Sequence, residues 1–235
     1  MNLNAKIVWI TGSGRGIGAA TACALAARGA RVVVSARRDD DIARVAAEIN
    51  ADGDSALAIQ CDVQKNSDIL QLVKQTQEVW GSIDILINNA GVATFKKILD
   101  TSEEEWDAML NTNLKSAFLC TKAVLPDMIR RRSGKIINVV SVAGKQAYVN
   151  CGGYCASKFG LRGFTDVLRM EHRHHGIQVT SIIAGATSTD IWGDAADHSL
   201  MMTPEHVAQA IVSICEAGDS THIEEIVLRP QGGDL

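Results

Sequence analysis

Short runs of β-branched and aliphatic residues alternate along the chain with longer amphipathic stretches. The runs have the length of strands, whereas the stretches carry apolar residues at the three- and four-residue spacing of a helix. This alternation predicts strands at residues 6–10, 31–35, 56–60, 83–87, 135–140, 178–183 and 225–229. It predicts helices at residues 17–28, 40–50, 67–80, 103–131, 154–174 and 204–216. A strand–helix–strand order is typical of a parallel sheet.

The ends of the predicted helices carry recognisable signals. Glycine, which tolerates the left-handed closing conformation, follows four of them, at Gly29, Gly81, Gly176 and Gly218. Thr203 and Pro204 supply an N-cap and a first helical residue for the last helix. Right-handed crossovers place such helices on both faces of the sheet. We therefore expect an α/β fold with a single Rossmann-type, doubly wound domain over residues 1–235, built on a seven-stranded, mostly parallel sheet.

Composition narrows the classes of function. Of the 235 residues, 46% are hydrophobic and 21% are charged, which is ordinary globular usage. The net charge of −4 gives no reason to expect nucleic acid as a partner. No apolar run has the length of a membrane span, and the run at residues 7–10 is too short for a signal peptide. We expect a cytoplasmic protein that binds neither nucleic acid nor membrane.

Several reactive or charged side chains leave alternatives open. The six cysteines are scattered without zinc-like spacing, so we expect reduced thiols, with Cys155 a candidate for modification beside Tyr154. The run Glu171-His172-Arg173-His174-His175 resembles a metal cluster, but its place at a helix end favours interaction with the helix dipole, and we expect no metal. The basic residues 130–132 fit either an acidic carrier protein or a solvated helix end.

A glycine-rich segment joins the first predicted strand to the first predicted helix. Its glycines allow a tight turn and a close approach to pyrophosphate, whose charge is met by the helix N-terminus. The alternative is a tight turn without a ligand. The segment predicts a dinucleotide-binding loop formed by Gly12, Ser13, Gly14, Arg15, Gly16, Ile17 and Gly18.

The end of the second strand discriminates between cofactors. An acidic residue there would bind the adenosine ribose of NAD, but Ala36 stands in its place. Arg37 follows, and with Arg15 and Arg38 it suits the 2′-phosphate of NADP(H) through forked, charge-assisted hydrogen bonds. We therefore predict NADP(H), with solvated arginines as the alternative.

Four motifs occur in order along the chain. They are the glycine-rich loop, Asn-Asn-Ala-Gly at residues 88–91, Ser141, and Tyr154-(x)3-Lys158. In this register the chain resembles the short-chain dehydrogenase/reductase family over nearly its whole length. The resemblance implies a catalytic tetrad of Asn113, Ser141, Tyr154 and Lys158. Asn113 is preferred to Asn111 because Asn-Leu-x-x-x-Phe continues from it.

The same resemblance implies further cofactor contacts. It assigns Asp62 and Val63 to adenine, Asn89, Ala90 and Gly91 to the adenine and ribose side, and Gly185, Thr187 and Thr189, with Tyr154 and Lys158, to the nicotinamide end. Two departures stand out. Ala184 replaces the family's usual proline, and only a short segment separates Thr189 from Thr203, so the cover over the substrate is short.

The spacing of Tyr154 and Lys158 puts both side chains on one face of a helix. A nearby ammonium favours phenolate and lowers the pKa of the tyrosine towards the working range. The family resemblance implies that Ser141 orients the carbonyl oxygen, that Tyr154 donates a proton to this oxygen, and that Lys158 also holds the nicotinamide ribose. The resemblance also implies that Asn113 interrupts its helix and anchors a water that relays protons to the lysine.

Two hypotheses of different class follow. The first is an NADPH-dependent oxidoreductase acting on a carbonyl or hydroxy substrate, with a carrier-bound 3-oxoacyl thioester and a 3-hydroxy or keto acid as alternatives. The second is a non-catalytic NADP(H)-binding regulatory protein, which would not need the intact tetrad. Specificity is assigned to residues 94–97, 145–151 and 191–202, where Val149, Trp192, Met201 and Met202 predict an apolar wall. The resemblance implies a homodimer or homotetramer formed through the two longest helices.

Overall fold

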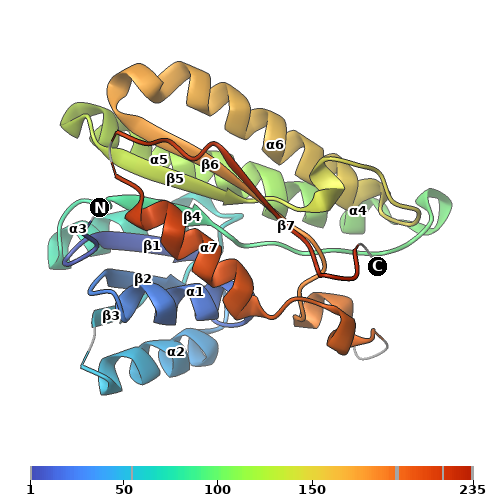
Figure 1. Cartoon of the computed structure of the whole chain (residues 1–235), viewed down its shortest axis with the longest axis horizontal. Helices are drawn as coiled ribbons and strands as arrows, with labels where there is room; N and C mark the ends of the chain where they lie inside the picture. Colours follow the sequence, from blue (N-terminus) through green and yellow to red (C-terminus); the bar gives the residue numbers. More distant parts are fainter. Residues whose placement is uncertain (1, 54, 194–195, 219, 234–235) are drawn as a thin grey trace.

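The computed structural model describes residues 2–53, 55–193, 196–218 and 220–233. Its centre is a sheet of seven parallel strands in the order β3-β2-β1-β4-β5-β6-β7 (Figure 1). The strands are β1 (Ile7–Thr11), β2 (Arg31–Ser35), β3 (Ser55–Ala58), β4 (Ile85–Asn88), β5 (Gly134–Val139), β6 (Ile177–Ala184) and β7 (Glu225–Leu228). The α/β doubly wound prediction is confirmed, and the predicted strand ends lie within two residues of those observed.

Helices cover both faces of the sheet. One layer contains α1 (Gly16–Ala26), α2 (Asp39–Ala51) and α7 (Pro204–Glu216), and the other contains α3 (Asn66–Val79), α5 (Ser116–Arg131) and α6 (Gly152–His172). Side chains alternate between the layers along each strand, as strand geometry requires. On β1, Val8 and Ile10 pack in the first core, whereas Ile7 and Trp9 pack in the second.

The prediction of one continuous helix over residues 103–131 is wrong, because the segment is interrupted. It is divided into α4 (Glu103–Leu110), a π-helical segment (Asn111–Lys115) and α5. A π-helical turn is wider than an α-helical turn and contains one extra residue. Within this segment Asn113 is buried, and its side chain forms hydrogen bonds with the backbone of Val92 in a neighbouring loop. This is the helix interruption that the family resemblance implies.

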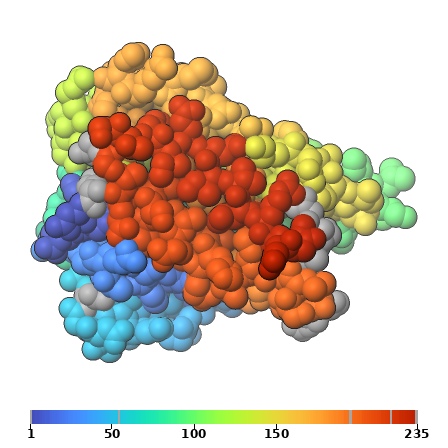
Figure 2. Space-filling model, viewed as in Figure 1, coloured from blue at the N-terminus to red at the C-terminus, as the bar shows by residue number. Residues whose placement is uncertain are grey.

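Short helical turns occupy the loops at the carboxyl edge of the sheet. They are η1 (Ile98–Asp100), η3 (Val142–Gly144), η5 (Asp190–Trp192) and η6 (His198–Leu200), while η4 (Arg173–His175) follows α6. An isolated bridge pairs Lys96 with Cys151, so the loops before α4 and α6 lie side by side. Figure 2 shows these two loops, in green and yellow, projecting at the right of the molecule. Within the described ranges, no helix is long and apolar enough to cross a membrane.

Candidate active site

A cavity of about 1210 Å³ opens at the carboxyl edge of the sheet. Its walls come from the loops after β1 to β6, which are the segments that the sequence predicts to meet there. Parallel strands end at the same edge, so side chains far apart in sequence converge on one space. The site is therefore built by the topology rather than by any one segment.

The glycine-rich loop approaches its neighbours more closely than a side chain would permit. Gly12 has a φ of +65°, and a Cβ there would lie 2.9 Å from the Ala90 Cα. Gly16, with a φ of +54°, begins α1 opposite Thr189. Arg15 is the N-cap residue but makes no capping bond with its side chain, so the first turn of α1 faces the cavity without a side-chain acceptor from the N-cap. Free N–H groups at a helix N-terminus suit a phosphate.

Two residues of the predicted loop support it from behind. The Ser13 hydroxyl donates to the Ile10 carbonyl at 2.8 Å and accepts from the Ser35 N–H at 2.8 Å. A Cβ at Gly18 would lie 2.5 Å from the Gly12 oxygen. Neither residue lines the cavity, whereas Gly12, Gly14, Arg15, Gly16 and Ile17 do.

Asn89 ties the loop after β4 to the glycine-rich loop. Its side-chain amide donates to the carbonyl oxygens of Thr11 and Gly12 at 2.9 and 3.2 Å. The Thr11 hydroxyl accepts from the backbone N–H groups of Asn89 and Ala90, each at 3.0 Å. These bonds fix the spacing of two cavity walls.

The three predicted arginines differ in their surroundings. Arg38 forms an ion pair with Asp41 at 2.6 Å, and Arg15 pairs with Asp190. Arg37 is exposed, lines the cavity and has no carboxylate partner among the described residues. Of the three, only Arg37 therefore presents its guanidinium to the cavity without a carboxylate partner among the described residues.

The remaining predicted cofactor residues also lie at the cavity. Asp62, Val63, Asn89, Ala90, Gly91, Gly185, Thr187 and Thr189 all line it. Ala184, in place of proline, keeps its N–H and ends β6 in register with Leu228. The Gly185 N–H donates to the Leu228 carbonyl at 2.8 Å, so this loop is anchored to β7.

Ser141, Tyr154 and Lys158 meet on one wall of the cavity. Ser141 follows β5, and the other two lie in the first two turns of α6. The Ser141 hydroxyl forms a hydrogen bond with the Tyr154 hydroxyl. The Lys158 ammonium is buried, donates to the Val139 carbonyl at 2.8 Å and lies 5.7 Å from the centre of the Tyr154 ring. A hydroxyl, a phenol and an ammonium are thus brought together.

Asn113 lies behind this wall. Its side-chain oxygen accepts from the Val92 N–H at 2.8 Å, and its amide donates to the Val92 carbonyl and to the Ser157 hydroxyl, each at 2.9 Å. The Ser157 hydroxyl in turn donates to the Tyr154 carbonyl at 2.8 Å. The sequence analysis does not predict a role for Ser157. Its position directly before Lys158 is the feature of the sequence that could have indicated one. A Cβ at Gly91 would lie 3.4 Å from the Asn113 Oδ1 and 3.8 Å from the Lys158 Nζ, so Gly91 separates these groups.

The prediction that Lys158 lowers the pKa of Tyr154 is not what the structure shows. Burial raises the pKa of Tyr154 to about 12, although its hydrogen bond with Ser141 acts in the opposite direction. Burial also lowers the pKa of Lys158 to about 8. The lysine donates to the Val139 carbonyl rather than to the phenol, and desolvation dominates both groups. At neutral pH the site therefore holds a protonated phenol.

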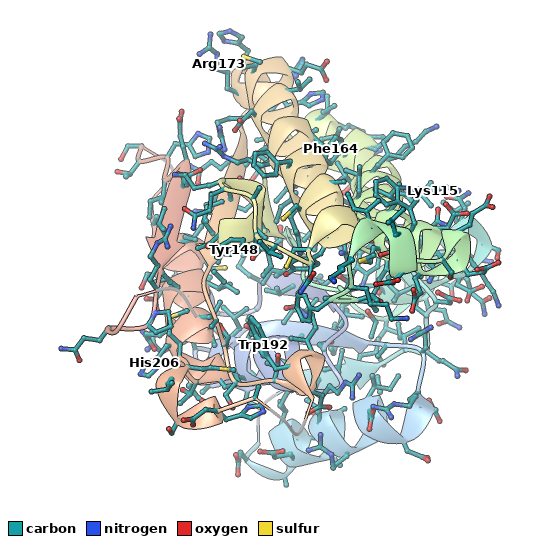
Figure 3. The ribbon with its side chains drawn as sticks, turned by 90° about the vertical axis from the view of Figure 1, so that its right-hand side faces the viewer. Lys115, Tyr148, Phe164, Arg173, Trp192 and His206 are labelled. Atoms are coloured by element: carbon teal, nitrogen blue, oxygen red, sulfur yellow. The ribbon has the colours of Figure 1, made fainter. Side chains whose placement is uncertain are left out.

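Aromatic side chains enclose the cavity next to Tyr154. Phe95 stacks on Trp192 with ring centres 5.3 Å apart, and it forms a T-shaped pair with Tyr154, with ring centres 6.0 Å apart. Tyr148 and Val149 line the facing loop. Figure 3 views the molecule from the right-hand side of Figure 1, with Tyr148 and Trp192 labelled near its centre. The predicted apolar wall thus contains Val149 and Trp192.

Two residues of the predicted wall lie elsewhere. Met202 is buried in the core that contains α7, because its backbone pairs with Ala186 and Ser188 and draws the side chain inwards. Met201 does not line the cavity either. The thiols that line the cavity are those of Cys61 and Cys151. The predicted Cys155 does not line it and is buried within α6.

The basic run at residues 130–132 does not lie near the cavity. It ends α5 just before β5, at the amino edge of the sheet, whereas the cavity opens at the carboxyl edge. Arg131 bonds Asp84 and Asp127, Arg130 pairs with Asp127, and Arg132 donates to the His174 carbonyl. A carrier bound there would not face the cavity. Among the described residues, no three His, Cys, Asp or Glu side chains are grouped to hold a metal ion.

Comparison with known proteins connects this geometry to a family. The sequence model of the family described as short chain dehydrogenase matches residues 6–199. Sepiapterin reductase of Chlorobaculum tepidum is 38% identical, over 97% of this chain and 98% of that protein. A 3-oxoacyl-[acyl-carrier-protein] reductase of Synechocystis sp. is 40% identical, over 80% of this chain and 77% of that protein.

Solved structures agree with this match. A metagenomic short-chain oxidoreductase in complex with NADP superposes with a TM-score of 0.87 and 33% identity, covering 98% of this chain and 99% of that one. The fold, the order of the motifs and the sequence similarity all point the same way. The protein is an enzyme, an oxidoreductase that belongs to the short-chain dehydrogenase/reductase family.

Proposed function

We propose that the enzyme uses NADPH to reduce a carbonyl compound to the corresponding secondary alcohol, and catalyses the reverse reaction with NADP. The observation that carries this proposal is the meeting of Ser141, Tyr154 and Lys158 on one cavity wall, in the same cavity as Arg37. The names of the two curated relatives, both reductases, support the direction.

The cavity fits a phosphorylated dinucleotide. The glycine-rich loop leaves space where a Cβ at Gly12 or Gly16 would intrude, and α1 presents its N-terminus there. Arg37, which has no carboxylate partner among the described residues, supplies a positive charge where a 2′-phosphate would be held. Ala36 stands at the position where an acidic residue would favour NAD, and the nearby Asp41 is paired with Arg38. At the other end, Gly185, Thr187 and Thr189 lie near the tetrad and would hold the nicotinamide.

When bound, the cofactor supplies the hydride that reduces the carbonyl carbon. The protein's own side chains bind the oxygen of the substrate carbonyl and supply its proton. The Ser141 hydroxyl orients the carbonyl oxygen, and the protonated Tyr154, within hydrogen-bonding distance of Ser141, donates the proton that the alkoxide needs. The Lys158 ammonium stabilises the phenolate that remains and binds the ribose hydroxyls. Asn113 holds the loop after β4 against α6.

A direct test is the oxidation of NADPH followed by absorbance with a panel of ketones, keto esters and 3-oxoacyl thioesters. Turnover with NADPH, at higher kcat/KM than with NADH, supports the proposal. NADPH binding without turnover across the panel would instead favour a non-catalytic regulatory protein.

We also propose that the enzyme is a homodimer or homotetramer paired through α5 and α6. Apolar side chains remain exposed along these helices, namely Phe118, Phe159, Val167 and Met170. Exposed apolar side chains of this kind favour association. Light scattering coupled to size exclusion measures the mass, and a monomer at micromolar concentration would contradict the assignment.

A further inference from the structure

The charged residues that line the cavity are unevenly distributed. Within the described part of the chain they are Arg15, Arg37, Arg38, Asp41, Asp62, Lys158 and Asp190. Arg15, Arg37, Arg38 and Asp62 follow β1, β2 and β3, and Asp41 lies in the first turn of α2, all at the cofactor end. Asp190 lies in η5 after β6, where its carboxylate is paired with Arg15, and Lys158 is buried against the Val139 carbonyl. The space on the other side of Tyr154 is bounded by apolar and aromatic side chains, with Asn150, Cys151 and hydroxyl groups as its polar members.

The nearest surface lysines do not alter this distribution. Lys96 and Lys97 follow Phe95 in sequence, and Lys145 precedes the loop that carries Tyr148, but none of the three lines the cavity. Lys96 pairs with Glu105, and Lys145 pairs with Glu225 at 2.6 Å. A carboxylate entering beside Tyr154 would lose its hydration. Among the described residues that line the cavity on that side, the one cation is the buried Lys158, which already donates to the Val139 carbonyl. Burial of such a carboxylate is strongly unfavourable.

The aromatic surface at this end is held in place. The Trp192 ring donates its Nε1–H to the Thr187 carbonyl at 3.0 Å, and its face lies within 17° of the plane of Phe95. Phe95 meets the catalytic phenol edge-on at an interplanar angle of 71°, and 38% of Phe95 remains exposed. Flat rings pack well against such faces and edges. A ring attached to the reacting carbonyl would therefore meet a rigid aromatic wall.

We propose that the enzyme reduces uncharged carbonyl compounds that bear an aromatic or similarly flat ring next to the carbonyl, and rejects keto acids of the same skeleton. Phe95 and Trp192 are the residues that set this preference. The inference rests on the proposed reductase function and selects among its substrate classes. It places the 3-hydroxy and keto acids outside the substrate range.

Three matched substrates test the proposal with NADPH: methyl benzoylformate, its free acid benzoylformate, and methyl pyruvate, which lacks the ring. We expect kcat/KM for methyl benzoylformate to exceed both others by at least about tenfold, because the acid buries an unpaired charge and the pyruvate ester loses the ring contact. Phe95→Leu and Trp192→Leu should each lower the ratio of kcat/KM for methyl benzoylformate to that for methyl pyruvate. Phe95→Leu should do so with the Kd for NADPH unchanged.

Two further variants sharpen the result. Phe95→Arg places a cation beside Tyr154 and should raise kcat/KM for benzoylformate relative to its ester. Leu99→Ala is the matched control, because Leu99 is 98% exposed in the neighbouring η1 and does not line the cavity. Leu99→Ala should leave the ratios of kcat/KM among the three substrates unchanged.

The outcomes separate the two claims. Reduction of benzoylformate or methyl pyruvate as efficiently as methyl benzoylformate would overturn the substrate class and leave the reductase function standing. Failure to reduce any of these three or any member of the ketone panel, with NADPH still bound, would overturn both.

Discussion

The Arg15 guanidinium in the glycine-rich loop forms an ion pair with the Asp190 carboxylate in η5. Two residues after Asp190, Trp192 contributes to the aromatic wall beside Tyr154. The pair therefore links the cofactor-binding loop to the segment that covers the substrate end. It also occupies one of the arginines that the sequence assigns to the cofactor phosphate. Both side chains are more than half exposed, so solvent weakens the pair.

Asp190→Asn should strengthen the binding of NADPH. Removing the carboxylate frees Arg15 for the 2′-phosphate, and the gain is limited to about 0.2–1 kcal/mol because the pair is exposed. We expect the Kd for NADPH to fall by up to about fivefold and the Kd for NADH to stay constant, as measured by calorimetry. Asp190→Glu, which keeps the charge, is the control. A higher Kd for NADPH in Asp190→Asn than in the wild type would contradict this prediction and would show that the ion pair assists binding.

Arg37→Ala should weaken NADPH binding far more than Arg38→Ala. Arg37 lacks a carboxylate partner among the described residues, whereas Arg38 is paired with Asp41. Loss of a charge-assisted hydrogen bond costs about 1.5–3 kcal/mol, which corresponds to roughly a tenfold to hundredfold rise in Kd. The Kd for NADH should be unaffected. Equal losses in the two variants would exclude a special role for Arg37.

Ser157→Ala should lower both stability and kcat. The Ser157 hydroxyl connects the Asn113 amide to the Tyr154 carbonyl, and its removal deprives one N–H of the buried Asn113 amide of its acceptor. We expect the free energy of unfolding to fall by about 1–3 kcal/mol. Because Ser157 acts through the placement of Tyr154, kcat should fall while KM for the carbonyl substrate and the Kd for NADPH change little.

Thermal unfolding and steady-state kinetics on the same sample measure both effects of Ser157→Ala. Ser157→Thr keeps the hydroxyl and should recover most of kcat. If kcat stays at the wild-type value in Ser157→Ala, Ser157 has only a packing role.

Carbonyl reduction should weaken as the pH rises through about 8. Burial lowers the pKa of Lys158 from 10.5 to about 8 and raises the pKa of Tyr154 to about 12. The phenol thus keeps its proton across the working range, and the ammonium is the group lost on the alkaline side. Titration of 13C-labelled lysine side chains by NMR should show one resonance with a midpoint near 8 that is missing in Lys158→Met. A midpoint near 10.5 for Lys158 would contradict this assignment.

The fold and much of the cofactor site follow from local patterns. Strand runs, helix periodicity and the glycine-rich loop lie within short segments, and the Tyr154 to Lys158 spacing needs only one helical turn. The family resemblance adds the order of the motifs. These features depend on neighbouring residues, so the sequence alone contains them.

The substrate end depends on contacts between distant residues. Phe95 meets Trp192 across 97 positions of sequence, and Arg15 meets Asp190 across 175. Met202 illustrates what the sequence alone does not reveal. Its apolar side chain suits either a cavity wall or the core, and the backbone hydrogen bond to Ala186 places it in the core. Likewise, the pKa of Tyr154 follows from its burial, which spacing does not reveal.

Tyr154→Phe tests the central claim, that the phenol donates the proton to the reduced carbonyl. The change removes one oxygen and keeps the ring that packs against Phe95. We expect kcat for carbonyl reduction with NADPH to fall by about 10²–10⁴-fold, as for other general acids, with the Kd for NADPH within about twofold of wild type. Retention of more than about a tenth of the wild-type kcat, with the cofactor bound normally, would contradict the account.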